Sequence, residues 1–298
     1  MPRKAFLLAI FTLLLWSLLA YFAARLSYLP SLWNLGVAFS VGGLIGGLRP
    51  TAWKVSPKVL LVGVYGIFGY HYLYFLAFRI APAVETNLIN YLWPLLIVLL
   101  SPLIVPGTPL RLHHLIGGLM GLAGALLILS GGKLHLEIQY IQGYLLAAGA
   151  AIIWATYTLL TKRLQPFPNA SVGAFILLSG LLALSAYFIE TGSFHMPTPK
   201  PIDWLIILLL GMGPMGLAFF TWDAAIKLGD PRIIGALSYL TPLTSTAILV
   251  VFGAHTLSWT SLLAMLLIMG GAITGSWDLL RRTPAKQIST PDPLTPQA

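Results

Sequence analysis

The sequence contains no cysteine and few charged residues. Without cysteine, the chain cannot carry a disulfide framework, a thiolate metal site or a cysteine nucleophile. Only 8% of its 298 residues are charged. Soluble domains have about 25% charged residues, because most of their surface faces water. Since 58% of the residues are hydrophobic, hydrocarbon is expected to surround most of the chain.

Patterns typical of enzymes and of charged partners are missing too. The apolar segments contain no His-Glu-x-x-His motif, no pair of central aspartates, and no serine and histidine framed for proteolysis. His113 and His114 begin a helix side by side, so we expect them on different faces and predict no metal site. The net charge of +9 is spread singly or in pairs between apolar runs, which does not indicate nucleic acid. We expect no catalytic activity and no cofactor.

Acidic residues are confined to the edges of the apolar runs. Glu85, Asp223 and Asp278 lie within a few residues of a run's end, where water and headgroups reach. None is the mid-bilayer carboxylate expected in many proton-coupled antiporters, so the sequence does not demand proton coupling. Glu85 with Arg79, or Asp223 with Lys227, could form gate-closing ion pairs, although ordinary end-of-helix pairs are the simpler interpretation.

The chain consists instead of long apolar runs, and a bilayer-spanning helix needs ~20 such residues. The first run lacks a small-residue cleavage site and precedes many others, so we expect a span and not a signal peptide. Residues 283–298 have the composition of a disordered tail. The sequence predicts an all-α membrane protein with ten spans, at 4–25, 31–48, 57–79, 83–104, 112–130, 140–161, 171–190, 202–225, 231–252 and 259–280.

Lysine and arginine favour one side of these spans. With a cytoplasmic N-terminus, the opposite side holds Arg25, Arg79, Lys133 and Lys200, and the cytoplasmic side holds all the others. Such a bias places both termini inside. The cytoplasmic set is Arg3, Lys4, Arg49, Lys54, Lys58, Arg111, Lys162, Arg163, Lys227, Arg232, Arg281, Arg282 and Lys286.

The chain also repeats itself. Residues 77–95 (AFRIAPAVETNLINYLWPL) match residues 225–243 (AIKLGDPRIIGALSYLTPL), 148 positions later, with Tyr91 meeting Tyr239 and Pro94 meeting Pro242. Near the start of each half, Trp16 meets Trp154 at an offset of 138. With five spans in each half, the second copy must be inserted upside down, and the substrate site is expected between the halves at mid-membrane. We predict repeats at 1–132 and 133–282.

These features resemble the drug/metabolite transporter superfamily. The paired Tyr-Leu-x-Pro-Leu segments and the tryptophan-bearing first helix of each half are similar to the EamA-type ten-helix exporters. Within these, His71, Trp93 and Trp154 in an aromatic-rich interior resemble the bacterial YddG-type aromatic amino-acid exporters. The resemblance covers residues 4–282. It implies export from the cytoplasm across the inner membrane by alternating access.

His71 lies near the centre of the third span, where an ionisable group is costly. It either bonds to a neighbouring carbonyl as a structural residue or contacts a substrate from a cavity, and we favour the cavity because Tyr70, Tyr72 and Tyr74 surround it. Trp154 is interpreted as an aromatic wall. For Trp16 and Trp93, wall and packing remain equally open.

Pro94 and Pro242 fall near the middle of the fourth and ninth spans. Each removes one helical hydrogen bond, which is expected to release the carbonyls of Asn90 and Ser238 towards protein or a watery cavity. We predict that both prolines are hinges. The complete set of predicted substrate-binding residues is His71, Tyr74, Asn87, Tyr91, Trp93, Trp154, Tyr157 and Tyr239.

The first functional hypothesis is an exporter of amino acids, preferentially aromatic, and of similar amphipathic metabolites, acting as a monomer. An aromatic lining with single polar groups suits such a zwitterion. The alternative is a broad-specificity drug or metabolite efflux protein of the same fold. A channel would need a continuous polar pore, for which the spans are too apolar.

Overall fold

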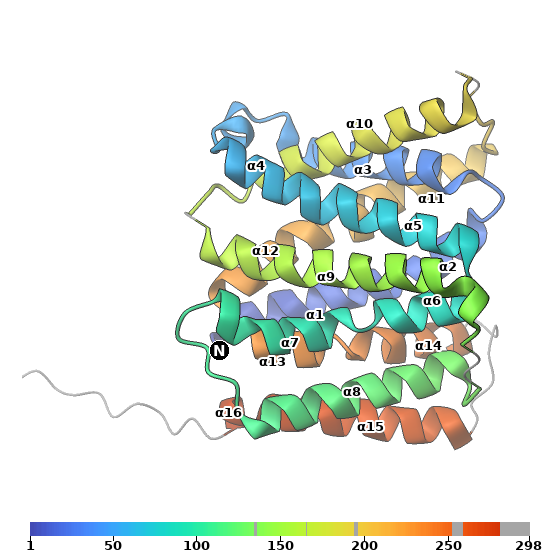
Figure 1. Cartoon of the computed structure of the whole chain (residues 1–298). Helices are drawn as coiled ribbons and strands as arrows, with labels where there is room; N and C mark the ends of the chain where they lie inside the picture. Colours follow the sequence, from blue (N-terminus) through green and yellow to red (C-terminus); the bar gives the residue numbers. More distant parts are fainter. Residues whose placement is uncertain (134–135, 165, 194–195, 252–258, 281–298) are drawn as a thin grey trace, which may run out of the picture.

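The computed structural model describes residues 1–133, 136–164, 166–193, 196–251 and 259–280. These residues form helices joined by short connections, with no strand among them. The predicted disordered tail, 283–298, lies outside the described residues. Figure 1 shows the helices side by side, running between two ends of the molecule.

In the first repeat, most predicted spans are built from more than one helical segment. The elements are α1 (Arg3–Ser17), α2 (Leu19–Arg25), α3 (Ser31–Gly47), η1 (Pro50–Trp53), α4 (Pro57–Val64), η2 (Tyr65–Gly69), α5 (Tyr70–Ile80), α6 (Ala83–Asn90), α7 (Trp93–Ile104) and α8 (Leu112–Ser130).

The second repeat follows a similar order. Its elements are η3 (Ile138–Tyr140), α9 (Ile141–Arg163), α10 (Ser171–Thr191), α11 (Pro201–Met212), η4 (Gly213–Leu217), α12 (Ala218–Leu228), α13 (Pro231–Leu237), α14 (Leu240–Val251), α15 (Trp259–Gly275) and α16 (Trp277–Leu280).

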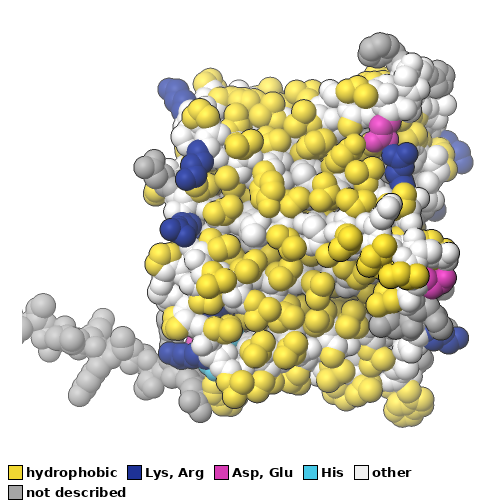
Figure 2. Space-filling view, viewed as in Figure 1, with side chains coloured by type: hydrophobic (Ala, Val, Ile, Leu, Met, Phe, Trp, Pro, Cys, Tyr) yellow, Lys and Arg dark blue, Asp and Glu magenta, His cyan; other side chains and the backbone are white. Residues whose placement is uncertain are grey.

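The molecule carries the apolar surface of a multi-pass membrane protein. Seven helices in the described ranges are long and apolar enough to cross a bilayer, and each agrees with a predicted run to within a few residues. Two shorter apolar helices, α3 and α15, fall on two further predicted runs. Figure 2 shows hydrophobic side chains covering the face between the two ends, with lysine and arginine gathered at the ends.

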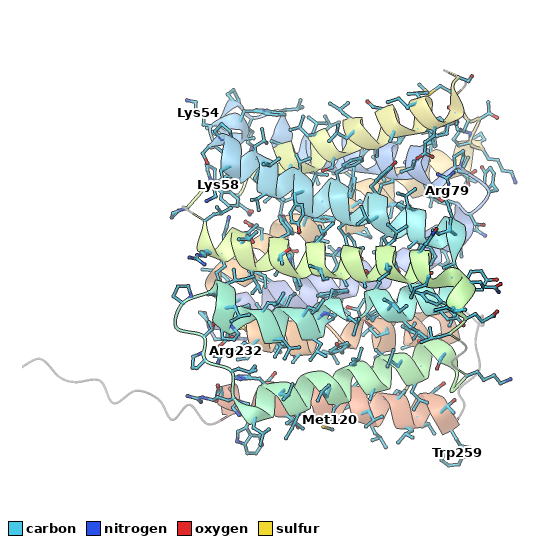
Figure 3. All side chains as sticks on the ribbon, viewed as in Figure 1. Lys54, Lys58, Arg79, Met120, Arg232 and Trp259 are labelled. Atoms are coloured by element: carbon cyan, nitrogen blue, oxygen red, sulfur yellow. The ribbon has the colours of Figure 1, made fainter. Side chains whose placement is uncertain are left out.

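Basic residues predicted to lie on opposite sides of the membrane are found at opposite ends of the molecule. Lys54, Lys58 and Arg232 lie at the end that also holds the N-terminus, whereas Arg79 lies at the opposite end (Figures 1 and 3). This grouping places predicted cytoplasmic residues together and away from a predicted external one.

Helix interruptions recur at the repeat offset. The π-turn η2 interrupts one helix and the π-turn η4 interrupts another, and they begin at Tyr65 and Gly213, 148 positions apart. The predicted fourth and ninth spans are also each broken, between α6 and α7 and between α13 and α14. Pro94 and Pro242 lie in the first turn after each break, where a missing N–H costs least.

One expectation about these breaks is wrong. The Ser238 carbonyl was expected to be released by Pro242, but it accepts a hydrogen bond from the main-chain N–H of Thr241 at 3.1 Å. The chain tightens into a turn at the break, so this carbonyl needs no partner from a cavity.

Contacts between the two halves also reflect the internal repeat. At one edge α3 lies along α10, and at the other α8 lies along α15 (Figure 1). Between the edges, α7 packs on α13. The contact between α1 and α12 is repeated by the contact between their counterparts, α9 and α5. Small residues allow the closest approach: a Cβ on Gly117 would lie 2.4 Å from the Gly275 nitrogen. Two Gly-x-x-x-Gly motifs, Gly117 to Gly121 and Gly271 to Gly275, therefore pack against each other within one chain.

Candidate functional site

A cavity of about 450 Å³ lies between the two halves. Segments from both repeats line it, including α1, α3, α5, α6, α9 and η4. This volume is within the range of small-molecule sites in proteins. The lining is mainly apolar, and its aromatic members are Trp16, Tyr70, Tyr74, Phe75, Phe78, Tyr91, Trp93, Trp154 and Phe219.

The structure brings most of the predicted substrate-binding residues to this one cavity. The lining contains His71, Tyr74, Asn87, Tyr91, Trp93 and Trp154. Tyr157 and Tyr239 are almost fully buried and lie behind the lining.

These two tyrosines hold interrupted helices in place. The ring of Tyr157 packs against the π-turn η2, where a Cβ on Gly66 would lie 2.0 Å from the ring. The hydroxyl of Tyr239 donates to the main-chain carbonyl of Tyr91 at 3.2 Å. Their positions are therefore those of supports for the cavity wall.

Three tryptophans form the deep part of the cavity. Ring centroids of Trp16 and Trp154 are 5.5 Å apart, and those of Trp93 and Trp154 are 6.3 Å apart, in edge-to-face arrangements. Trp222 packs behind them, with its centroid 5.0 Å from that of Trp16. Edge-to-face aromatic pairs are favourable beyond their buried area. Trp16, Trp93 and Trp154 form an apolar floor, and with Trp222 behind them they make up the tryptophan cluster.

Single polar groups are set into the aromatic wall. The Tyr74 hydroxyl donates to Asn87 Oδ1 at 2.6 Å, and Asn90 Nδ2 donates to the Tyr70 hydroxyl at 3.0 Å. Such hydrogen bonds fix the orientation of side chains that a ligand would meet.

His71 is both a structural and a cavity residue. Its Nδ1 lies 2.7 Å from the main-chain oxygen of Ile67, which can only accept, so Nδ1 carries the proton. In the neutral ring Nε2 is then an acceptor. The two interpretations of His71 from the sequence are therefore not exclusive.

Phe219 lines the cavity and was not predicted from the sequence, although the repeat could have supplied it, because it lies 148 positions after His71. Thr241, beside Pro242, was expected in the same space and does line the cavity. Asn34 and Ser245 line the cavity without any such signal.

The cavity reaches one end of the molecule. Its lining extends to Ser27 and Leu29, in the α2–α3 connection, and to Phe78 and Asn87, on either side of the α5–α6 connection. Figure 1 places both connections at the end away from the N-terminus.

The opposite end is closed by polar contacts behind the tryptophan cluster. Trp222 Nε1 donates to the Thr158 hydroxyl at 3.1 Å. One turn further along α9, Lys162 Nζ donates to the carbonyls of Ile226, Lys227 and Gly229 at 2.7, 3.0 and 2.6 Å. These carbonyls end α12, where the helix dipole favours a cation.

One of the two ion pairs considered from the sequence is formed. Lys227 Nζ lies 2.7 Å from Asp223 Oδ2, at the closed end. Arg79 does not pair with Glu85, because its guanidinium lies 2.6 Å from Glu190 on α10.

His113 and His114 do not point to different faces, as expected from their place in the sequence. Their ring centroids are 4.2 Å apart, and both Nε2 atoms lie 3.4 Å from Asp278. The main-chain N–H of Arg111 donates to His114 Nδ1, so the neutral ring carries its proton on Nε2, facing Asp278. That proton occupies the position a metal would need on His114, and neither histidine Nε2 makes a hydrogen bond within the described residues. The two rings therefore lie near the Asp278 carboxylate without being bonded to it.

Known proteins resemble the chain along almost its whole length. The EamA-like transporter family matches twice, over residues 3–130 and 141–276. The aromatic amino acid exporter YddG of Ancylobacter novellus is 39% identical over 91% of this chain and 97% of that protein. Its namesake in Escherichia coli K12 is 28% identical over 94% of this chain and 99% of that protein. A crystal structure with 36% sequence identity superposes with a TM-score of 0.87, covering 96% of this chain and all of that one.

Proposed function

Because the chain belongs to the EamA-like transporter family, we propose that it exports amino acids, preferentially aromatic ones, and similar amphipathic metabolites by alternating access. It is a multi-pass membrane transporter and not an enzyme. The names of the two exporters that it resembles support the choice of substrate.

The aromatic cavity is the observation that carries the proposal. The aromatic ring of a substrate can pack on the floor of Trp16, Trp93 and Trp154 in the same edge-to-face geometry that these tryptophans adopt with one another. Acceptors for an ammonium group are available at His71 Nε2 and the Asn87 amide. No carboxylate belongs to the described lining, so recognition of the ammonium rests on neutral groups.

The proposed architecture has ten spans in two inverted halves. In the first half they are α1–α2, α3, α4–α5, α6–α7 and α8; the second half repeats them from α9 onwards. Recurrence of the π-turns and of the two helix breaks at the repeat offset supports this grouping. We infer that the chain lies in the bacterial inner membrane with both termini cytoplasmic.

In this orientation the cavity faces outward. It reaches the end that holds Arg79, predicted to be external, and is closed by Lys162 and its partners at the other. This conformation is then the one that releases the substrate to the outside. The inward-facing state requires the polar contacts at the closed end to break and equivalent closure to form outside.

We also propose that one copy is the functional unit. The cavity is built within a single chain, and the glycine motifs are occupied by contacts inside it. A second copy is not needed to complete the site.

Counterflow in proteoliposomes tests the substrate assignment. Vesicles containing the purified chain are loaded with unlabelled L-phenylalanine, and uptake of labelled L-phenylalanine is followed with and without competitors. Tryptophan and tyrosine are expected to inhibit strongly, and glycine, aspartate and lysine weakly. Absence of counterflow with every aromatic amino acid would refute the proposal.

The same assay separates the alternative of broad-specificity efflux. An apolar cationic dye such as ethidium shares the aromatic ring system but lacks the zwitterion. If ethidium competes as well as tryptophan does, the ring alone is recognised and the drug-efflux alternative is correct.

A further inference from the structure

Two helices beside the cavity each contain a π-turn, at positions related by the internal repeat. η2 covers Tyr65–Gly69 and η4 covers Gly213–Leu217. Only the second contains a proline, Pro214, so proline is not their common cause. π-Turns are rare, and they occur often at functional sites. Their recurrence in both halves indicates a shared role.

Trp16 connects the cavity to the second π-turn. Its Nε1 donates to the main-chain carbonyl of Pro214 at 3.2 Å. Trp16 lines the cavity from α1, so this bond joins the first half of the chain to the π-turn of the second. Met215, the next residue of that turn, also lines the cavity. The indole bond therefore lies where a ligand can disturb it.

The repeat gives this bond a counterpart that is not formed. Trp154 corresponds to Trp16 at the offset of 138, and Gly66 corresponds to Pro214 at the offset of 148. Trp154 lines the cavity, and within the described part of the chain its indole N–H makes no hydrogen bond. The two halves thus differ at this equivalent pair.

Trp154 lies on the same face of α9 as Tyr157, the residue that packs on Gly66. A Cβ on Gly66 would lie 2.0 Å from the ring of Tyr157. Tyr157 is three residues after Trp154 on the same face of α9, and their ring centroids are 5.3 Å apart. A change in the tilt of α9 against η2 can therefore bring the indole to the Gly66 carbonyl.

We propose that Trp16 and Trp154 alternate as positioning residues that hold the two π-turns. Trp16 donates to Pro214 while the cavity faces the Arg79 end, and Trp154 donates to Gly66 while it faces the opposite end. Inverted halves that exchange conformations also exchange the contacts between them. The inference rests on the proposed alternating access, because it requires two such states.

Single-cysteine labelling tests the exchange directly. The chain has no cysteine of its own, so Ser27→Cys places a single thiol at the cavity mouth, where Ser27 lines the cavity and is exposed. The labelling rate with a membrane-impermeant maleimide, in proteoliposomes without ligand, reports the outward-facing population. Two variants are compared in this background: Trp16→Phe and Trp154→Phe. Each keeps an aromatic ring and loses one indole N–H.

The two variants are expected to differ although the residues are equivalent by the repeat. Trp16→Phe loses a bond made only in the outward-facing state, so the ratio of outward-facing to inward-facing protein falls about fivefold, the effect of one hydrogen bond. Labelling is therefore slower than in the Ser27→Cys chain without a second substitution. Trp154→Phe labels at least as fast as that chain. Equal labelling of Trp16→Phe and Trp154→Phe would overturn the proposal, because loss of packing alone does not distinguish the two states.

A replacement that preserves the shape of the side chain separates the loss of the indole N–H from a loss of packing. Benzothienylalanine at position 16 keeps the outline of the indole and replaces its N–H with sulfur. It is expected to slow labelling as Trp16→Phe does, and unchanged labelling contradicts the role of the N–H. Counterflow of L-phenylalanine is measured in parallel on the Ser27→Cys chain. Failure of counterflow refutes the substrate assignment, whereas the order of labelling decides the indole exchange by itself.

Discussion

Tyr239 donates its hydroxyl to the main-chain carbonyl of Tyr91 at 3.2 Å, and the two residues are 148 positions apart. That separation is the offset of the internal repeat, so the bond joins equivalent residues of the two halves. Tyr91 lies in the break between α6 and α7, and Tyr239 lies in the break between α13 and α14. The two interrupted helices are therefore tied to each other at their breaks.

Tyr239→Phe is expected to lower the stability of the chain. The substitution leaves the Tyr91 carbonyl without its partner, and an unsatisfied buried acceptor costs about 1–3 kcal/mol. Melting in detergent, followed by tryptophan fluorescence, measures the loss. Tyr91→Phe is the matched control, because the acceptor is a main-chain atom that this change keeps. Equal melting temperatures for the two variants contradict the prediction.

The contact between α8 and α15 predicts opposite behaviour for two neighbouring glycines. A Cβ on Gly271 would lie 2.7 Å from the Gly117 oxygen and 2.7 Å from the Gly121 nitrogen, which are main-chain atoms. A Cβ on Gly270 would meet only the flexible end of Met120, at 2.9 Å. Gly271→Ala is expected to destabilise the chain by about 2 kcal/mol through overpacking.

Gly270→Ala is expected to be neutral or slightly stabilising, because alanine has the higher helix propensity. Both variants are compared by thermal melting. A Gly271→Ala protein as stable as the Gly270→Ala protein would show that the helices can move apart at no cost.

The repeat and the apolar runs allowed much of the fold to be predicted. Apolar runs are set by bilayer thickness, so their lengths translate directly into helices. The π-turns were not predicted, because η2 has neither proline nor any other local signal that separates it from an ordinary helix. The predicted release of the Ser238 carbonyl failed because Thr241 satisfied it locally.

The sequence predicted those site residues whose side chains are unusual in the middle of a membrane span. His71 and Trp154 are conspicuous at mid-span, and both line the cavity. Tyr157 and Tyr239 have the same residue type but lie behind it. Which face of a helix meets the cavity depends on tilts and breaks that are set by tertiary packing, so residue type alone could not separate lining from support.

Lys162 is expected to stabilise the closed end. Its three carbonyl acceptors belong to the last turn of α12 and the residues after it, and hydrogen bonds to a charged group contribute about 1.5–3 kcal/mol. Lys162→Met keeps the aliphatic length and removes the donors. We expect lower labelling of Ser27→Cys, because the outward-facing state loses its closure.

Arg163→Gln is the matched control for Lys162. Arg163 is the exposed neighbour, and among the described residues it donates to the Ile104 carbonyl alone, at 3.3 Å. Its loss is expected to change labelling less than twofold, as is usual for an exposed contact. If Lys162→Met labels as fast as Arg163→Gln, Lys162 does not hold the closed end.

Arg232 links stability to pH through Asp230. Burial alone would raise the pKa of Asp230, but the hydrogen bonds and charge of Arg232 outweigh it and hold that pKa below its ordinary value of 3.8. A lowered pKa stabilises the fold above 3.8, and this stabilisation is lost as the pH falls through the folded value.

Arg232→Gln is therefore expected to cost about 2 kcal/mol, because it breaks a largely buried pair. The difference from the natural chain should be constant from about pH 5 upward and shrink below about pH 4. Melting temperatures across that range measure it. Arg111→Gln, at the exposed pair with Asp278, should cost less than about 1 kcal/mol. A difference for Arg232→Gln that does not shrink in acid contradicts the assignment to Asp230.

Trp154→Ala and His71→Ala are expected to reduce L-phenylalanine counterflow roughly tenfold or more, because one removes a floor ring and the other a polar wall group. Both residues line the cavity, whereas Trp259 is 86% exposed at the α15 edge (Figure 3). Trp259→Ala thus controls for the loss of an aromatic residue and should transport normally. Normal counterflow by a well-folded chain carrying both Trp154→Ala and His71→Ala would show that the substrate does not bind in this cavity. Transport would then depend on a path that the tryptophan floor does not enclose.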